Sequence, residues 1–283
     1  MDNKTSTKNI LIKKASGDEE LFMPKKLRHS LLNAGAQSDT VAKIVADIQD
    51  WIFPGATTKE IYRRAFSILH REATRPATRY KLKQALFALG PTGYPFEILI
   101  GQLFKQKGFD TEVGVVVDGH CLTHEMDVIA TNNSIQHLME CKYHKDQGKH
   151  VSIQVPLYVR SRVDDIIRKR EGMEEYRGYS FTGWVVTNTS FSSDSLQYGN
   201  CNGLNLLAWD YPIGKGLKNI IEDLKIYPIT ILNNLNSKAK QHLLNQGVVT
   251  CSQLLENMVL LQTFGLSKTK YDALRNEINQ LCF

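Results

Sequence analysis

Three residues near the middle of the chain have the types and spacing that metal-dependent hydrolysis of a phosphodiester bond requires. Asp127 stands in an apolar stretch, and Glu140 and Lys142 follow a polar break at residues 131–134. The break contains two asparagines, which tolerate the positive φ of a tight turn, so the pattern predicts a β-hairpin. Because strand residues alternate between faces, Glu140 and Lys142 are expected on one face, with Asp127 alongside.

This grouping has a chemical logic. Mg²⁺ or Mn²⁺ binds one or two carboxylates and keeps other positions for water and substrate phosphate. The metal can polarise the phosphate and lower the pKa of a bound water, and a lysine nearby can position that water or stabilise charge on phosphorus. An acid followed two residues later by lysine is common by chance, so a surface hairpin with unrelated charges is the alternative.

With its flanking sequence, the pattern resembles the PD-(D/E)xK nuclease signature, in the form of the Mrr-type restriction endonuclease family. The resemblance covers residues 93–212 and departs from the family before the aspartate, where Thr-His-Glu-Met (123–126) replaces a glycine-rich lead. It implies that Asp127 and Glu140 hold the metal and that Lys142 assists the attacking water. It also implies that Glu97 completes the metal shell and that Gln154 orients water or phosphate, although both could be ordinary solvated helix residues.

Further basic and metal-binding side chains surround this segment. His144, Lys145 and Lys149 could form a basic lip that contacts DNA phosphates, or part of a solvated charged loop. Zinc is disfavoured because no C-x-x-C pair occurs and neighbouring strand residues point to opposite faces; its candidate ligands would be His120, Cys121, His124, Cys141 and His144. The charged run 160–171 is expected to be a helix face with i,i+4 ion pairs, and a DNA-facing role for its arginines is the minority interpretation.

The first ninety residues predict a separate domain of two short strands and four helices. The third helix is expected to begin with a capping box of Thr57 and Glu60, the fourth to span residues 76–89, and the domain to end at Gly90-Pro91. Residues 9–90 resemble the ATP-cone, a regulatory nucleotide-binding domain. The resemblance implies that five basic residues meet the triphosphate of ATP or dATP, namely Lys13, Lys14, Lys25, Lys26 and Arg28. An ordinary solvated surface is the alternative, and no P-loop sequence is present.

The last sixty residues predict a small helical domain. Within T-F-G-L-S (263–267), Gly265 is expected to supply an unusual φ and Ser267 to cap the final helix. This segment resembles helix-hairpin-helix domains, which implies that Lys268 and Lys270 contact DNA near a helix N-terminus. Protein contact is the other use of such a domain.

The composition fits this organisation without deciding it. The chain has 283 residues, a net charge of +6 and a pI near 8.9, which mildly favours a polyanionic partner. No signal-peptide core or apolar run of about 18 residues is evident, so a cytoplasmic location and no membrane partner are expected. Five scattered cysteines form no disulfide framework, as expected in a reducing compartment.

The sequence therefore predicts an α/β multidomain protein. The expected parts are an α+β ATP-cone (1–90), a restriction-endonuclease-like α/β core with a mixed central sheet (91–225) and a small all-α helix-hairpin-helix-like domain (226–283). The expected function is a Mg²⁺-dependent deoxyribonuclease of the restriction or defence type, resembling type II or type IV enzymes, that cuts double-stranded DNA as a homo-oligomer under control of ATP or dATP. RNA or branched DNA stays open as substrate. The alternative is a nucleotide-responsive DNA-binding regulator on an inactive nuclease scaffold.

Overall fold

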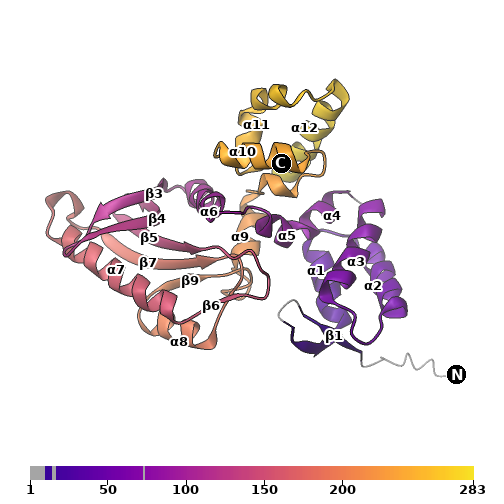
Figure 1. Cartoon of the computed structure of the whole chain (residues 1–283), viewed down its shortest axis with the longest axis horizontal. Coiled ribbons are helices and arrows are strands. Elements are labelled where there is room, and N and C mark those ends of the chain that lie inside the picture. Colours follow the sequence, from indigo (N-terminus) through magenta and orange to yellow (C-terminus); the bar gives the residue numbers. More distant parts are fainter. Residues whose placement is uncertain (1–9, 15–16, 73) are drawn as a thin grey trace. The chain divides into compact units, whose positions relative to one another are not determined.

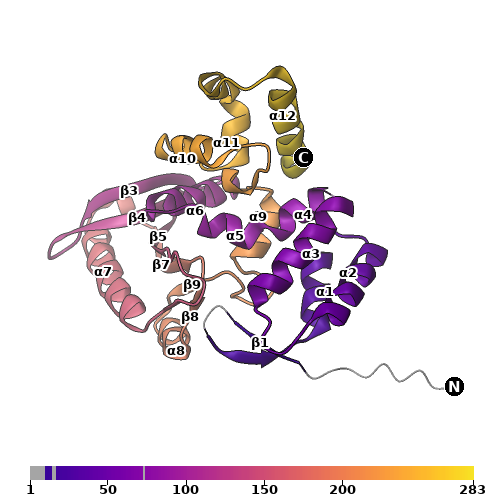
Figure 2. The same cartoon turned by 45° about the vertical axis from the view of Figure 1, so that its right-hand side comes forward.

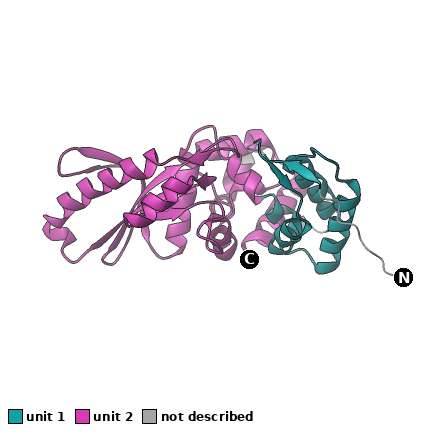
Figure 3. Ribbon diagram, turned by 90° about the horizontal axis from the view of Figure 1, so that it is seen from below, with its two compact units in different colours: residues 1–81 teal, residues 82–283 magenta. Residues whose placement is uncertain are grey.

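A computed structural model describes residues 10–14, 17–72 and 74–283. The chain divides into two compact units, residues 1–81 and 82–283 (Figure 3). The expected boundaries after residues 90 and 225 differ from this division. Leu82 and Leu86 of the expected last cone helix pack into the same hydrophobic cluster as Leu243 and Leu281 near the C-terminus. Shared apolar packing therefore makes the chain after residue 81 one unit.

The first unit follows the expected order of two strands and then helices (Figure 1). Strands β1 (Leu11–Lys13) and β2 (Glu19–Leu21) pair antiparallel. The helices after them are α1 (Pro24–Asn33), α2 (Ser38–Trp51), α3 (Thr58–Glu72) and α4 (Thr74–Tyr80). Apolar residues at helical spacing form the core, among them Leu31, Ile44, Ile48 and Leu69. The helix expected over residues 76–89 is divided into α4 and α5 (Leu82–Phe87), and the division between the units falls between these two helices.

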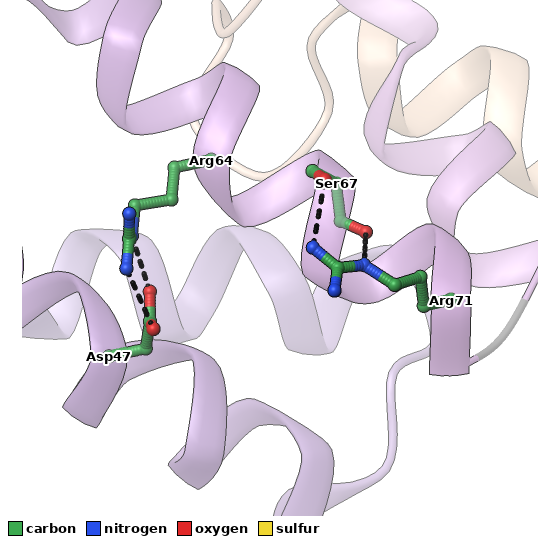
Figure 4. A network of polar contacts seen from close by, with 4 residues as sticks. All are labelled: Asp47, Arg64, Ser67 and Arg71. Atoms are coloured by element: carbon green, nitrogen blue, oxygen red, sulfur yellow. Dashed lines mark hydrogen bonds and ion pairs between the residues drawn. The ribbon is translucent and has the colours of Figure 1, made fainter.

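Local polar contacts fix α3 against its neighbours. The Thr57 hydroxyl accepts from the Glu60 N–H while the Glu60 carboxylate accepts from the Thr57 N–H, at 3.2 and 2.8 Å, so the expected capping box is confirmed. Arg64 of α3 donates two hydrogen bonds to Asp47 of α2, at 2.5 and 2.9 Å (Figure 4). Both side chains are more than a third exposed, so solvent screening limits this pair to about 1 kcal/mol of stability.

The second unit is built on a five-stranded sheet in the order β3-β4-β5-β7-β9. Strands β3 (Asp110–Asp118), β4 (Thr123–Asn132) and β5 (Ile135–Lys142) pair antiparallel. Strands β7 (Ser180–Thr187) and β9 (Asn205–Leu207) continue the sheet parallel to β5. The expected mixed sheet is therefore confirmed. Strands β6 (His150–Val151) and β8 (Ser190–Phe191) form a separate parallel pair.

Helices cover both faces of this sheet (Figures 1 and 2). Helix α6 (Tyr94–Gln106) packs its apolar side against one face, where Val128 and Met139 belong to the same cluster. Helices α7 (Gln154–Glu171) and α8 (Ser193–Cys201) cover the other face, over Ile129 and Leu138. The sheet is thus buried on both sides, as parallel pairing usually requires.

Short helices complete the second unit. They are the 3₁₀ turns Glu174–Tyr176, Ile229–Ile231 and Met258–Phe264, with α9 (Leu217–Leu224), α10 (Ser237–Asn245), α11 (Cys251–Glu256) and α12 (Lys268–Cys282). Gly265 has a φ of +58° and the Ser267 side chain accepts from the Lys270 N–H, so both expectations for this elbow are confirmed. Asn236, not Ser237, caps α10. No helix in the described ranges has the length and apolar character needed to cross a bilayer.

Tyr143 ties the end of β5 to the start of the second unit. Its hydroxyl donates to the Phe87 carbonyl at 2.8 Å and accepts from the Gly90 N–H at 2.9 Å. A Cβ at Gly90 would come within 2.9 Å of the same oxygen, so only glycine allows this approach. The contact holds the strand end that carries Glu140 and Lys142.

We therefore expect Tyr143→Phe to lower the free energy of unfolding by about 1–3 kcal/mol, because it leaves two half-buried backbone groups without their partner. Urea denaturation followed by circular dichroism measures this effect. Tyr94→Phe is the matched control, because the Tyr94 side chain is 51% exposed. Equal stability of the two variants would contradict the assigned role of the hydroxyl.

Candidate functional site

The expected hairpin carries the three central residues. Strands β4 and β5 pair from Val128↔Met139 to Asn132↔Ile135, and Asn133 in the turn has the anticipated positive φ, at 49°. This register puts Asp127 across from Glu140. The Asp127 Oδ2 atom accepts a hydrogen bond from the Cys141 N–H at 2.6 Å, which fixes the carboxylate beside β5.

Carboxylates crowd this end of the hairpin. Glu97, in the first turn of α6, has a pKa raised to about 7 by burial and by the charges of Asp127, Glu125 and Glu140. Burial and the Glu140 charge likewise raise the pKa of Asp127 to about 6, although the Cys141 N–H opposes this. Burial and neighbouring negative charge disfavour ionisation of Glu97 and Asp127, so a bound cation would relieve the cluster. The structure thus brings Glu97 to the two strand carboxylates, as expected.

Glu140 has two partners that the sequence patterns did not reveal. The Tyr158 hydroxyl donates to Oε1 at 2.6 Å, and Arg162 Nη1 donates to Oε2 at 2.9 Å. Both partners belong to α7, which begins at Gln154; Gln154 itself is exposed. Residues 154, 158 and 162 share one helix face, so helical spacing from the glutamine could have revealed them.

Lys142 lies half-buried at the end of β5. Its carbonyl accepts from the Thr187 hydroxyl at 2.8 Å, which joins β5 to β7. Its ammonium group makes no ion pair or hydrogen bond with any residue that the structure describes. Alternation along β5 places it on the face of Glu140. A cation in this position is free to act on a bound substrate.

His144 and Lys145 differ in character. The backbone N–H of His144 donates to Asn188 Oδ1 at 2.9 Å, and its Nδ1 lies 3.0 Å from the Thr189 hydroxyl. Burial and the charge of Lys142 lower the pKa of His144, so the ring is neutral near pH 7 and offers no charge to phosphate. Lys145 is exposed, so its positive charge is accessible to a DNA phosphate.

The donor set suits a hard cation better than zinc. Within residues 10–14, 17–72 and 74–283, no three His, Cys, Asp or Glu side chains form a preformed cage. His124 instead lies 2.8 Å from Asp165 Oδ2, and Cys141 is buried. Mg²⁺ needs only one or two carboxylates besides water and phosphate, and Asp127, whose pKa the charge of Glu140 helps to raise, has such a second carboxylate nearby.

The five basic residues expected at a nucleotide triphosphate lie on β1, α1 and the segment between them, and all are exposed. Lys14 and Lys26 both pair with Glu20, at 3.0 and 2.9 Å. These contacts lower the pKa of Glu20, with Lys26 the largest cause. Lys13, Lys25 and Arg28 remain on the surface. A separate groove of about 750 Å³ between α2 and α3 is lined by Arg63, Arg64 and Arg71, and no sequence pattern indicated a site there.

At the other end of the chain, Lys268 and Lys270 occupy the first turn of α12 and are exposed. Their placement at a helix N-terminus is the one expected for contacts with phosphate.

Comparison with known proteins gives relatives without an assigned activity. Residues 227–282 match the family described as AF1548-like, C-terminal. An uncharacterized protein of Archaeoglobus fulgidus is 30% identical over 172 residues, which are 60% of this chain and 92% of that protein. A crystal structure titled protein of unknown function AF1548 superposes with a TM-score of 0.53 at 28% identity, over 68% of this chain and 98% of the other. The likeness supports the α/β fold.

The raised pKa of Glu97 has a consequence for stability. A carboxyl whose folded-state pKa lies above its unfolded value stabilises the fold fully only below the unfolded pKa, and this contribution disappears as pH rises through the folded value. The window for Glu97 therefore runs from about 4.5 to about 7. Glu97→Gln should raise the free energy of unfolding by about 2 kcal/mol at pH 8 in chelator and change it little at pH 4.

Thermal unfolding at both pH values, with and without Mg²⁺, measures this effect. Glu112→Gln, at an exposed position of β3, is the control. A Glu97→Gln effect of the same size at both pH values would show that the repulsion is absent.

Proposed function

This chain belongs to the AF1548-like family, and we propose that it is a metal-dependent endonuclease that hydrolyses phosphodiester bonds in double-stranded DNA. The observation that carries the proposal is the raised pKa of both Glu97 and Asp127 beside Glu140; burial is the largest cause of each shift, and the charge of Glu140 contributes to both. Strongly perturbed groups of one charge, gathered at one place, are typical of functional sites. The nearby ammonium of Lys142 supplies the charge that a phosphate substrate needs.

Each residue has a distinct role in this proposal. Asp127 and Glu140 would hold Mg²⁺ or Mn²⁺, and Glu97 would complete or orient the shell. Once bound, the metal supplies a Lewis acid and a more acidic water. Lys142 would position a water and stabilise negative charge on the phosphate oxygens. Gln154, at the exposed start of α7, would contact the phosphate or the water from the same helix that supports Glu140.

The remaining expectations belong to the same proposal. Unit 1 would bind ATP or dATP through Lys13, Lys14, Lys25, Lys26 and Arg28 and regulate cleavage. Lys268, Lys270 and Lys145 would contact the DNA backbone, where lysine charge releases counterions. Homo-oligomerisation would bring two active sites to the two strands. A restriction or defence role in the cytoplasm is consistent with this chemistry.

One observation favours a second candidate function. Both oxygens of Glu140 are already engaged by Tyr158 and Arg162. A carboxylate held in this way could be part of a scaffold that no longer binds metal. The protein would then be a nucleotide-responsive DNA-binding regulator.

Plasmid cleavage with Mg²⁺ tests the two functions against each other. Asp127→Ala and Lys142→Ala are each expected to lower the cleavage rate at least about a hundredfold, because each removes a group that acts on the reacting phosphate. DNA affinity in a gel shift should change less than about threefold. Lys105→Ala, at an exposed lysine in the last turn of α6, is the matched control.

The assay is run with ATP, dATP and neither, on modified and unmodified plasmid. Cleavage by the wild type that the Asp127→Ala variant lacks supports the nuclease. DNA binding that responds to nucleotide without any cleavage supports the regulator instead.

The C-terminal lysines generate a separate expectation. Replacing both Lys268 and Lys270 with alanine should weaken DNA binding and reduce the slope of log K against log salt by about 1 for each phosphate that these lysines neutralise. Titrations at several salt concentrations measure this slope. Arg275→Ala, on an exposed part of the same helix, is the control. An unchanged slope in the double variant would show that these two lysines do not contact DNA phosphates.

A further inference from the structure

Arg162 donates a hydrogen bond to Oε2 of Glu140, one of the two carboxylates proposed to hold a metal. We propose, on the basis of the function proposed above, that Arg162 is a placeholder cation. It holds Glu140 while no divalent metal is bound, and the metal displaces it. Its released guanidinium then binds the DNA phosphate next to the metal.

The geometry of the contact allows displacement. Only one guanidinium nitrogen, Nη1, reaches Glu140, at 2.9 Å from Oε2. By contrast, Arg64 grips Asp47 through two nitrogens. The Arg162 side chain is 25% exposed and that of Glu140 12%, so the pair lies at the edge of solvent rather than in the core. A single, solvent-accessible contact is easier to exchange than a fork-to-fork pair.

The charges explain why a cation occupies this place. The negative charges of Glu140 and Glu125 raise the pKa of Asp127, whereas the positive charge of Arg162 lowers it. Arg162 therefore partly neutralises the carboxylates that would bind metal. A divalent cation supplies more charge at the same position, so the two compete for Glu140. This competition is what separates a placeholder from a residue that merely orients a ligand.

The freed side chain has suitable chemistry for its second role. A guanidinium carries five N–H donors in a planar fork that matches a phosphate. Arg162 uses one donor for Glu140, and its guanidinium carbon lies 5.9 Å from the centre of the Tyr158 ring, which keeps the side chain on that side of α7. Tyr158 retains its own bond to Oε1, so Glu140 stays oriented when the arginine leaves.

The sign of one binding change tests the first step. Mn²⁺ binding is measured by titration calorimetry on the full chain without DNA. Arg162→Gln removes the competing charge and should bind Mn²⁺ about tenfold more tightly, whereas removal of an orienting partner typically weakens metal binding about 10- to 100-fold. Arg162→Lys keeps the charge and should stay within about threefold of the wild type. Tyr158→Phe removes the other Glu140 bond without removing charge and should not tighten binding.

Duplex binding tests the second step. Ca²⁺ is used because its looser coordination suits binding better than in-line attack. Arg162→Gln should weaken duplex affinity about tenfold with Ca²⁺, because the variant cannot reach the phosphate, and should leave affinity unchanged in chelator. Far-ultraviolet circular dichroism and thermal melting establish that each variant is folded.

The outcomes separate this proposal from the one it rests on. Unchanged or weaker Mn²⁺ binding by folded Arg162→Gln overturns the placeholder role, as does an equal decrease of duplex affinity with and without Ca²⁺. If Asp127→Ala binds Mn²⁺ as well as the wild type, the metal site itself is wrong. If Asp127→Ala no longer binds Mn²⁺ while Arg162→Gln gains no affinity, the metal site stands and only the role of Arg162 fails.

Discussion

Repulsion between half-buried carboxylates is the constraint on which the second unit depends. Glu97, Asp127 and Glu140 come from a helix and two strands, and the fold holds them together although burial and neighbouring negative charge raise the pKa of Glu97 and of Asp127. A shift of one pKa unit corresponds to about 1.4 kcal/mol. The Cys141 N–H, the Tyr158 hydroxyl and the Arg162 guanidinium offset part of that cost.

The sheet explains how three separate segments meet. Antiparallel pairing across a short turn sets Asp127 opposite Glu140, a local event that the hairpin alone determines. Parallel pairing of β5 with β7 then requires a crossover, and α7 is that crossover. Its course over the sheet carries Tyr158 and Arg162 to Glu140. The helix that covers this face of the sheet therefore also supplies the positive charge of Arg162 beside Glu140.

The sequence predicted what depends on local patterns and missed what depends on distant packing. The hairpin, the positive φ of Asn133, the Thr57–Glu60 capping box and the Gly265–Ser267 elbow all follow from residues a few positions apart. The boundary between the two units does not follow from such local patterns. Leu82 and Leu86 have the spacing of any amphipathic helix, and only tertiary contacts decide which core they join. The Arg162–Glu140 pair was also missed, because the charged run alone does not indicate which residue finds a distant partner; only helical spacing from Gln154 points to Arg162.

The loss of folding stability caused by the charged groups of the site also bears on the choice between a nuclease and an inactive scaffold. A chain that needed only the fold could replace Glu97 with glutamine and remove a repulsion that opposes folding at neutral pH. It could also replace Lys142, whose ammonium makes no ion pair or hydrogen bond with any described residue. Groups that lower stability and yet remain together are more readily understood as serving chemistry than packing. The engaged state of Glu140 favours the scaffold, but under the placeholder proposal Arg162 would compensate the carboxylate charge only until a metal binds. We therefore favour the nuclease.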